Sequence, residues 1–188
     1  MVYPISKRIA WFILSRFVKD IQGLENIPPP PAIIVSNHES DLDGPLLYFL
    51  LLKYKKKLVF PILTDERFTG FFGDLLARYF CIIRVNSGAV AQAYKALQDG
   101  NYVIIFPEGQ RTFDGKIQKV THTGLGVLAI LSNVPVVPIK IHSYKFWNRH
   151  MSFPSLKNKI TVKIGKLRVF KGRIKEGWVN KQDAKKLI

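Results

Sequence analysis

The sequence predicts a single α/β domain built on a mostly parallel central sheet that is flanked by helices. At 188 residues, 47% of them hydrophobic, the chain is long enough to bury one core. Short β-branched and aromatic runs alternate with longer segments of helical character along most of its length. Strands and helices that alternate in this way are typical of a parallel sheet with helices packed on its faces.

Six short runs are predicted to form the strands. Three of them, at 32–36, 102–106 and 134–141, are mostly apolar, as expected for strands that are buried on both faces. Residues 160–164 alternate between apolar and polar side chains and predict a half-exposed strand. The remaining predicted strands cover residues 58–63 and 80–85.

Helices are predicted between these strands, and turn residues mark some of their ends. Asp99 and Gly100, for example, end the helix that precedes the strand at 102–106. The predicted helices cover residues 44–52, 71–79, 90–98 and 124–132. Reactive side chains in such folds gather on the loops that follow the strand ends, so a functional site is expected there.

The segment 1–22 is expected to form a membrane-associating amphipathic helix ahead of the main domain at 23–188. Wound at about 100° per residue, it gathers Trp, Phe and Ile side chains into a broad apolar arc, with Arg8, Arg16 and Lys19 opposite. The alternative is a helix that packs on the protein's own core, and a wide arc allows both. No apolar run approaches the ~20 residues needed to cross a bilayer, and a cleavable signal peptide is not predicted.

The chain is strongly basic, with 29 lysines and arginines against 13 acids and a net charge of +16. Eleven of the basic side chains fall within residues 157–188, and four lysines fall within residues 53–57. A field of this sign favours anionic partners: nucleic acid, anionic lipid headgroups or phosphorylated metabolites. For each cluster the alternative is an ordinary solvated surface.

The cysteine count and the histidine spacing argue against a metal site. Cys81 is the only cysteine, which excludes an intramolecular disulfide and a site built from several cysteines. It lies in an apolar run and is predicted to be a buried small hydrophobe. His38 and Glu39 begin like a zinc-protease helix, but Leu42 stands where the second ligand is required. No metal is therefore expected.

The first candidate site follows the strand at 32–36 and reads Ser-Asn-His-Glu-Ser-Asp-Leu-Asp-Gly-Pro. His38 and Asp43 cannot share one face of a regular helix, but across a turn into a helix N-terminus the carboxylate can fold back on the imidazole. A carboxylate bonded to one ring nitrogen makes the other a better general base, which is worth about 10²–10⁴ in rate. Spacing alone leaves alternatives open: Asp41 as the partner, Ser40 or Asp41 as a helix cap, or a purely structural histidine.

The second candidate site follows the strand at 102–106 and reads Phe-Pro-Glu-Gly-Gln-Arg-Thr. Gly109 allows close backbone approach, and Arg111 offers a planar, forked donor suited to phosphate. The alternative is a common Glu-Gly turn beside a solvated arginine. Taken alone, each of the two motifs is a weak signal.

Together and in this order, the two motifs resemble those of the glycerolipid acyltransferase family. Three further segments strengthen the resemblance: residues 23–28 match the lead-in to the first block, Arg84 matches the arginine of the second, and residues 134–139 match the fourth. The sequence departs from the family pattern at Gln110, where the family usually has Thr, and at Thr112, where it usually has Ser.

The resemblance implies an O-acyltransferase of phospholipid biosynthesis. It would move an acyl group directly from acyl-CoA or acyl-carrier protein to the free hydroxyl of 1-acyl-sn-glycerol 3-phosphate, giving phosphatidic acid without a cofactor. His38 would be the general base and Asp43 its orienting partner. The residues implied to shape the acceptor site are Arg84, Glu108, Gly109, Arg111 and Thr112, with Val137 and Pro138 in its wall.

Three alternatives stay open beside this reading. The same chemistry can act on glycerol 3-phosphate or on another lysophospholipid. A relative that binds lipid without catalysis is the second, and the intact His38 and Asp43 argue against it. The third is a basic nucleic-acid-binding module, but the basic residues at 157–188 are not interleaved with stacking aromatics, so no nucleic-acid partner is expected.

The expected location is peripheral, on the cytoplasmic face of a membrane. The N-terminal helix and the basic clusters would hold the protein on an anionic lipid surface, at about 1 kcal/mol for each basic side chain near that surface. A lysophospholipid acceptor could then enter the site without leaving the bilayer.

Overall fold

The computed structural model describes residues 4–55, 59–63, 78–85, 88–120 and 123–172. Within these residues, seven strands form one sheet in the order β1-β7-β6-β2-β5-β3-β4. All neighbours are parallel except β6 and β7. The strands are β1 (Val18–Gln22), β2 (Ala32–Ser36), β3 (Val59–Leu63), β4 (Ile83–Arg84), β5 (Tyr102–Ile105), β6 (Val136–His142) and β7 (Ile160–Ile164). The predicted class, α/β with a mostly parallel sheet, is confirmed.

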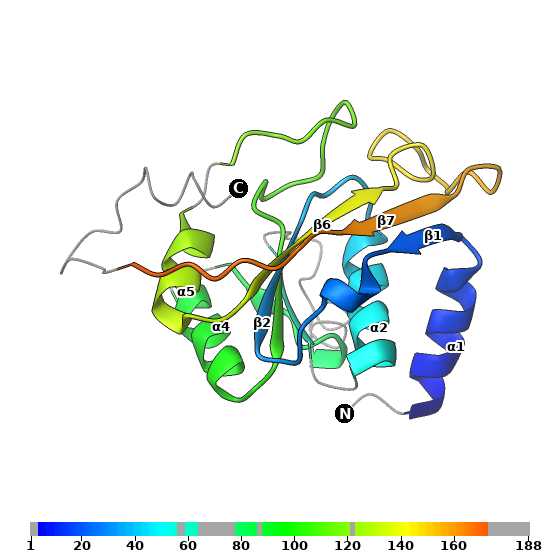
Figure 1. The fold of residues 1–188 in the computed structure, drawn as a ribbon. Helices are drawn as coiled ribbons and strands as arrows, with labels where there is room; N and C mark the ends of the chain where they lie inside the picture. The colour runs from blue at the N-terminus through cyan, green and yellow to red at the C-terminus, as the bar shows by residue number, and fades with distance from the viewer. Residues whose placement is uncertain (1–3, 56–58, 64–77, 86–87, 121–122, 173–188) are drawn as a thin grey trace.

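Helices cover the two faces of the sheet (Figure 1). On one face α1 (Pro4–Ser15) packs against α2 (Asp43–Lys55), and on the other α4 (Ala89–Gln98) packs against α5 (Gly124–Ser132). A short 3-10 helix, η1 (Leu24–Asn26), follows β1. Each face has its own apolar cluster, so the central strands are buried on both sides, as their continuous apolar sequence predicts.

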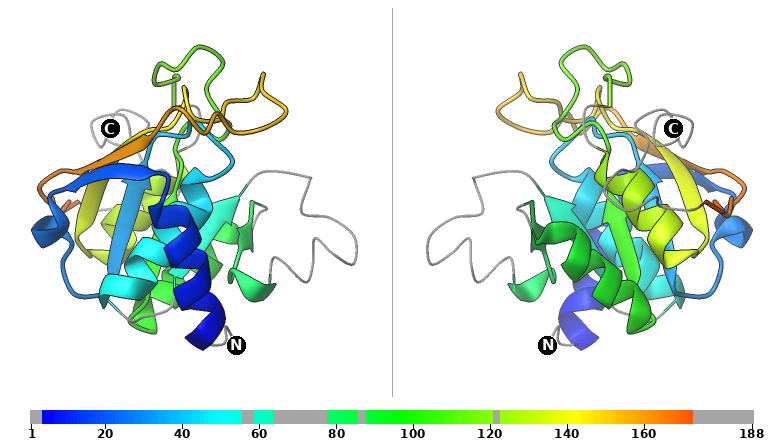
Figure 2. Two further views of the ribbon diagram at one scale, coloured as in Figure 1. Left: turned by 90° about the vertical axis from the view of Figure 1, so that its right-hand side faces the viewer. Right: turned by 90° about the vertical axis from the view of Figure 1, so that its left-hand side faces the viewer.

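Strand β2 is the centre of the arrangement, because it pairs in parallel with β5 on one side and β6 on the other. Ile33 and Ile34 of β2 are completely buried and point to opposite faces. Since the three strands run in the same direction, the loops that follow them leave the sheet at one edge. Figure 2 shows these loops together above the sheet in both views.

One predicted strand differs from the structure in extent, Cys81 differs in its surroundings, and one predicted helix cannot be compared. The strand expected at 80–85 is wrong for most of its length, since only Ile83 and Arg84 pair with β3. Cys81 lies in a turn with φ of 53° and is partly exposed, so the expectation of a buried small hydrophobe is also wrong. The helix expected at 71–79 falls mainly on residues outside the described part of the chain.

The N-terminal helix is shorter than expected. It ends at Ser15, and Val18–Gln22 form β1, which pairs in parallel with β7. A single helix through residue 22 is therefore wrong, because the apolar side chains of Val18 and Ile21 pack on the core as parts of a strand.

Helix α1 divides its apolar side chains between the core and the outside. Trp11 and Leu14 pack against the core, while Phe12 and Ile13 are exposed. The alternative of packing on the protein's own core is thus confirmed for one side of the helix. Among the described residues, no helix combines the length and the apolar character that crossing a bilayer requires.

The turn after β1 generates the first prediction. Gly23 has φ of +80°, and a Cβ there would collide with the carbonyl oxygen of Ile164 in β7. Gly100 has a similar φ of +75° with open space around it, so it is a matched control. We expect Gly23→Ala to lower the unfolding free energy by about 1–3 kcal/mol more than Gly100→Ala, because only the first adds a clash to the left-handed strain. Urea unfolding of both variants measures this, and equal losses would contradict the close contact between β1 and β7.

Candidate active site

The loops after β2 and β5 are joined at the carboxyl edge of the sheet. The backbone N–H of His38 donates to Oε1 of Glu108 at 3.0 Å, and the N–H of Thr112 donates to the carbonyl of His38 at 2.8 Å. An ion pair of 2.7 Å between Nη1 of Arg111 and Oδ2 of Asp41 connects them again. The two motifs, seventy residues apart in sequence, are therefore one site.

The carboxylate of Asp43 is the centre of this site. Its Oδ2 accepts the N–H groups of Glu39 and Ser40 at 2.6 and 2.7 Å and lies 3.1 Å from Nδ1 of His38. Its Oδ1 accepts the hydroxyl of Ser143 at 2.6 Å. Asp43 is completely buried and begins α2, where the helix dipole also favours a negative charge. Four donors therefore compensate the cost of burying this charge.

The partner of the histidine is Asp43 and not Asp41, which settles the alternative that spacing left open. A carboxylate can only accept, so the ring proton of neutral His38 must lie on Nδ1. The ring also stacks on Phe106, with centroids 4.3 Å apart and planes 24° apart. Its side chain is 15% exposed. The imidazole is thus held in one orientation, with Nε2 as the nitrogen that can take a proton from a bound molecule.

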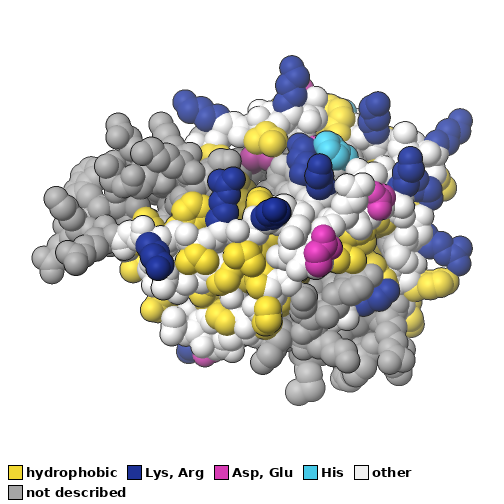
Figure 3. All heavy atoms as spheres, in the orientation of Figure 1, with side chains coloured by type: hydrophobic (Ala, Val, Ile, Leu, Met, Phe, Trp, Pro, Cys, Tyr) yellow, Lys and Arg dark blue, Asp and Glu magenta, His cyan; other side chains and the backbone are white. Residues whose placement is uncertain are grey.

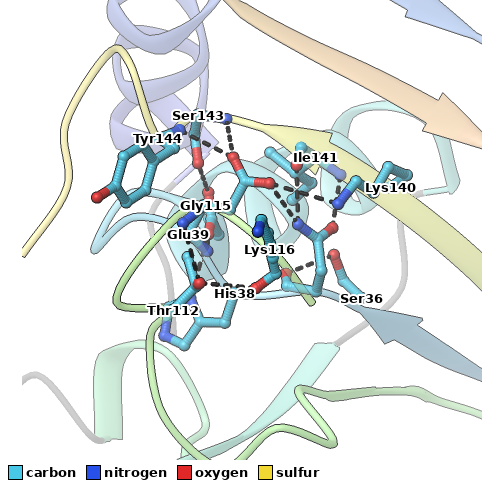
Figure 4. Close-up of polar contacts among 12 residues, drawn as sticks. Ser36, His38, Glu39, Thr112, Gly115, Lys116, Lys140, Ile141, Ser143 and Tyr144 are labelled. Atoms are coloured by element: carbon cyan, nitrogen blue, oxygen red, sulfur yellow. Dashed lines mark hydrogen bonds and ion pairs between the residues drawn. The ribbon is translucent and has the colours of Figure 1, made fainter. Parts of the chain in front are cut away.

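A buried polar network behind His38 fixes the loop to β6 (Figure 4). The side chain of Asn37 pairs with the backbone of Ile141, donating to its carbonyl at 2.9 Å and accepting its N–H at 2.7 Å. Glu39 accepts the N–H groups of Ser143 and Tyr144, each at 2.9 Å. These contacts join the loop after β2 to the loop after β6, so that three strand ends meet at the site.

Both carboxylate oxygens of Glu108 accept hydrogen bonds from backbone N–H groups. Oε1 accepts the N–H of His38, and Oε2 accepts that of Gln118 at 2.7 Å. Burial raises the pKa of Glu108, opposed by these hydrogen bonds. Because the folded protein then holds the proton more tightly than the unfolded chain, this group favours folding below its ordinary pKa, and that contribution is lost as the pH rises through the raised value. In this geometry Glu108 positions the His38 loop.

The other predicted acceptor-site residues are placed differently from one another. Gly109 has φ of +73° and makes the tight turn after β5. Thr112 is buried, and its hydroxyl donates to the carbonyl of Lys116 at 2.7 Å, so this side chain organises its own loop. Arg111 is connected to the loop that carries His38 by its ion pair with Asp41. Arg84 ends β4, two strands away from β5 but at the same edge of the sheet.

A cavity of about 360 Å³ lies next to this site. Its walls are mainly apolar and include Val35, Val136 and Pro138, with Glu108 on the side toward His38. Three cationic side chains also line it: Lys140, Lys163 and Arg168. Figure 3 shows the face that carries β6 and β7, where Lys and Arg side chains stand among hydrophobic ones. Val137, which the sequence placed in the wall with Pro138, faces the core on the other side of the sheet instead.

Metal ligation finds no support in the described part of the chain, where no group of three or more His, Cys, Asp and Glu side chains could hold an ion. His122, another histidine near the second motif, lies outside the described residues. The absence of a metal stays a prediction.

Sequence reasoning missed Ser143, Asn37 and Glu39 as parts of the site. Ser143 is the first residue after β6, the third buried strand of the predicted set. The same signal that pointed to the loops after β2 and β5, a polar residue directly after a buried parallel strand, was present there.

Ser143 generates the second prediction. Ser143→Ala removes the side-chain hydroxyl that donates to Oδ1 of Asp43 but leaves the backbone bond to Glu39 in place. We expect a loss of about 1–3 kcal/mol in unfolding free energy, because a buried carboxylate oxygen loses its partner. Ser132→Ala, which removes a hydroxyl bonded to a helical carbonyl in α5, is the matched control and should cost about 0.5 kcal/mol or less. Chemical denaturation that finds the two losses equal would contradict the network.

The chain is similar to known acyltransferases. A sequence model of the family described as Acyltransferase matches residues 19–142. A 1-acyl-sn-glycerol-3-phosphate acyltransferase of Pseudomonas aeruginosa is 30% identical over 135 residues, which are 68% of this chain and 51% of the relative. A chloroplastic enzyme of the same name from Brassica napus is 33% identical over 143 residues, 73% of this chain and 41% of the relative. The chain thus spans about half the length of these relatives or less.

A solved structure agrees on the fold. The crystal structure of the 1-acyl-sn-glycerophosphate (LPA) acyltransferase PlsC from Thermotoga maritima matches with a TM-score of 0.69 and 24% identity, over 96% of this chain and 72% of that chain. Since the family match extends over more than half of the sequence and contains both motifs and the carboxyl edge where they meet, the chain belongs to the acyltransferase family.

Proposed function

We propose that this protein transfers an acyl group from an acyl thioester to the free hydroxyl of 1-acyl-sn-glycerol 3-phosphate, giving phosphatidic acid. The observation that carries the proposal is the contact of 3.1 Å between Nδ1 of His38 and the buried carboxylate of Asp43. It supports His38 as a general base, because a carboxylate bonded to Nδ1 orients the ring and makes Nε2 the better proton acceptor.

The chemistry follows from this arrangement. Nε2 of His38 takes the proton from the acceptor hydroxyl as its oxygen attacks the thioester carbonyl. The Asp43 carboxylate stabilises the imidazolium that forms. The tetrahedral intermediate then collapses and the carbon–sulfur bond breaks. The departing thiolate takes up the proton that His38 holds. No acyl-enzyme is formed, and no cofactor takes part.

The substrates are proposed from the relatives and from the cavity. Both curated relatives described above are named for acylation of 1-acyl-sn-glycerol 3-phosphate. A mainly apolar cavity with three cationic side chains beside the site suits a molecule that joins an acyl chain to a phosphate. Acyl-CoA and acyl-carrier protein both remain possible donors, and glycerol 3-phosphate or another lysophospholipid is the alternative acceptor.

We assign the remaining residues by their contacts. Arg111 is proposed to bind the acceptor phosphate through its planar fork, in exchange for part of its pairing with Asp41. Arg84, at the same sheet edge, is proposed to add positive charge. Glu108, Gly109 and Thr112 are proposed to shape the pocket by holding the loop that carries Arg111.

The location and partners are also proposals. The exposed side of α1 is proposed to rest on an anionic membrane surface at the cytoplasmic face, so that the acceptor is taken from the bilayer. The exposed Ile9, Phe12 and Ile13 support this, because apolar side chains of this size beside basic ones favour the lipid interface. The absence of a nucleic-acid partner stays a prediction.

The test of the function is acyl transfer from labelled acyl-CoA and from acyl-carrier protein to a panel of glycerol 3-phosphate and lysophospholipids. We expect product on 1-acyl-sn-glycerol 3-phosphate, and a loss of about 10²–10⁴ in rate for His38→Ala. His142→Ala, which removes an exposed histidine at the end of β6, is the matched control and should keep full activity.

The panel also separates the alternatives. Activity confined to another acceptor would keep the mechanism and replace the substrate. Transfer that is indifferent to His38, or no transfer with any pair, would contradict the proposed function.

A further inference from the structure

Two loops beside the active site are tied into one unit, here called the rim: residues 110–119 after β5 and residues 143–159 between β6 and β7. The hydroxyl of Tyr144 donates to the carbonyl of Phe113 at 2.9 Å, and Nε2 of His150 lies 3.1 Å from the same oxygen. The guanidinium of Arg149 stacks on the Phe113 ring, 3.7 Å from its centroid. The two loops lie together at the carboxyl edge of the sheet (Figure 2).

The rim exposes large apolar side chains. Phe153 is 82% exposed and Leu156 is 69% exposed, both on the loop between β6 and β7. Ile117 and Phe113, on the neighbouring loop, are 60% and 49% exposed. Single exposed hydrophobics are ordinary, but four of them on two loops that contact each other favour an interaction surface here.

The same loops are cationic. They contain seven basic side chains and a single acid, Asp114. The basic residues are Arg111, Lys116, Lys119, Lys145, Arg149, Lys157 and Lys159. Apolar side chains surrounded by long cationic ones match the interface of an anionic bilayer, where the rings and aliphatic chains enter the headgroup layer and the ammonium groups reach the phosphates.

The base of the rim contacts the chain just after the end of α1. Lys159, at the base of the β6–β7 loop, donates from Nζ to the carbonyl of Arg16 at 2.8 Å, just after the end of α1. Figure 1 shows α1 and the β6–β7 loop projecting on the same side of the molecule. Phe12 of the helix and Phe153 of the loop are both largely exposed.

A lipid surface fits the rim better than an acidic protein does, because the rim leads to the cavity. Ile117 is both an exposed rim residue and part of the cavity wall. Ile117 therefore connects the rim with the cavity that Glu108 also lines.

We propose that the rim docks on the surface of an anionic bilayer, with Phe153 and Leu156 in the interfacial layer, and that this contact is separate from any contact made by α1. The proposal deepens the proposed function, since its choice of partner rests on a lipid acceptor. The consequence is that the active-site loop stands at the lipid surface, where the acceptor is delivered.

A fluorescent label attached to Phe153→Cys, in a Cys81→Ala background, reports the contact of the rim with the bilayer directly. The vesicles contain phosphatidylcholine with or without phosphatidylglycerol, and brominated lipids act as quencher. We expect a blue shift and quenching at position 153 that are stronger with phosphatidylglycerol. The same label at Leu131→Cys, a 48% exposed position on α5, is the matched control and should not respond.

Vesicle sedimentation of variants with the native cysteine gives an independent reading. Phe153→Ser together with Leu156→Ser should weaken partitioning by about tenfold or more, because two large side chains no longer enter the interface. Leu131→Ser should leave partitioning unchanged. Thermal unfolding confirms that the variants fold, as expected for exposed positions.

Each other outcome overturns the proposal. A label at 153 that stays unquenched while the protein sediments with vesicles would leave α1 as the sole contact. A response only to added acyl-carrier protein, in the absence of vesicles, would make the rim a protein-binding surface. Failure to bind vesicles at all would also exclude the contact. These measurements need no acyl donor, so they fail or succeed independently of the acyl-transfer assay.

Discussion

The burial of the Asp43 carboxylate is the constraint on which the rest of the site depends. A charge with no exposure is tolerated only when its oxygens are fully bonded. Its donors come from the loop after β2, from the imidazole of His38 and from Ser143 after β6. All four donors reach the carboxylate when β2 and β6 are paired in their observed register, so the geometry of the candidate site depends on the sheet.

Much of the fold can be predicted from the sequence because its central strands are buried on both faces. Continuous apolar runs identify β2, β5 and β6 without knowledge of their partners. Strand β1 could not be found in this way. Val18–Gln22 continue an amphipathic pattern that also suits a helix, and they become a strand because they pair with β7, about 140 residues away in sequence. That pairing leaves no local signal.

The contacts of the candidate site differ in the same way in how far the sequence predicts them. His38 and Asp43 are close in sequence, so a turn into a helix predicts their contact. Spacing does not distinguish Asp43 from Asp41; in the structure Asp43 contacts His38, and Asp41 pairs with Arg111 from another loop. The role of Glu108 also depends on contacts between loops, although the family resemblance places it in the acceptor site. Only the sheet register shows that its oxygens face the backbone N–H groups of His38 and Gln118.

The most direct test of the central claim is the tautomer of His38, read by nitrogen NMR of the imidazole at a pH where the ring is neutral. The chain has four histidines, and comparison with His38→Ala assigns the signal. We expect a proton on Nδ1, bonded to Asp43, and an unprotonated Nε2. A ring protonated on Nε2, or one that exchanges between the two tautomers as free histidine does, would contradict the claim that Asp43 orients a general base.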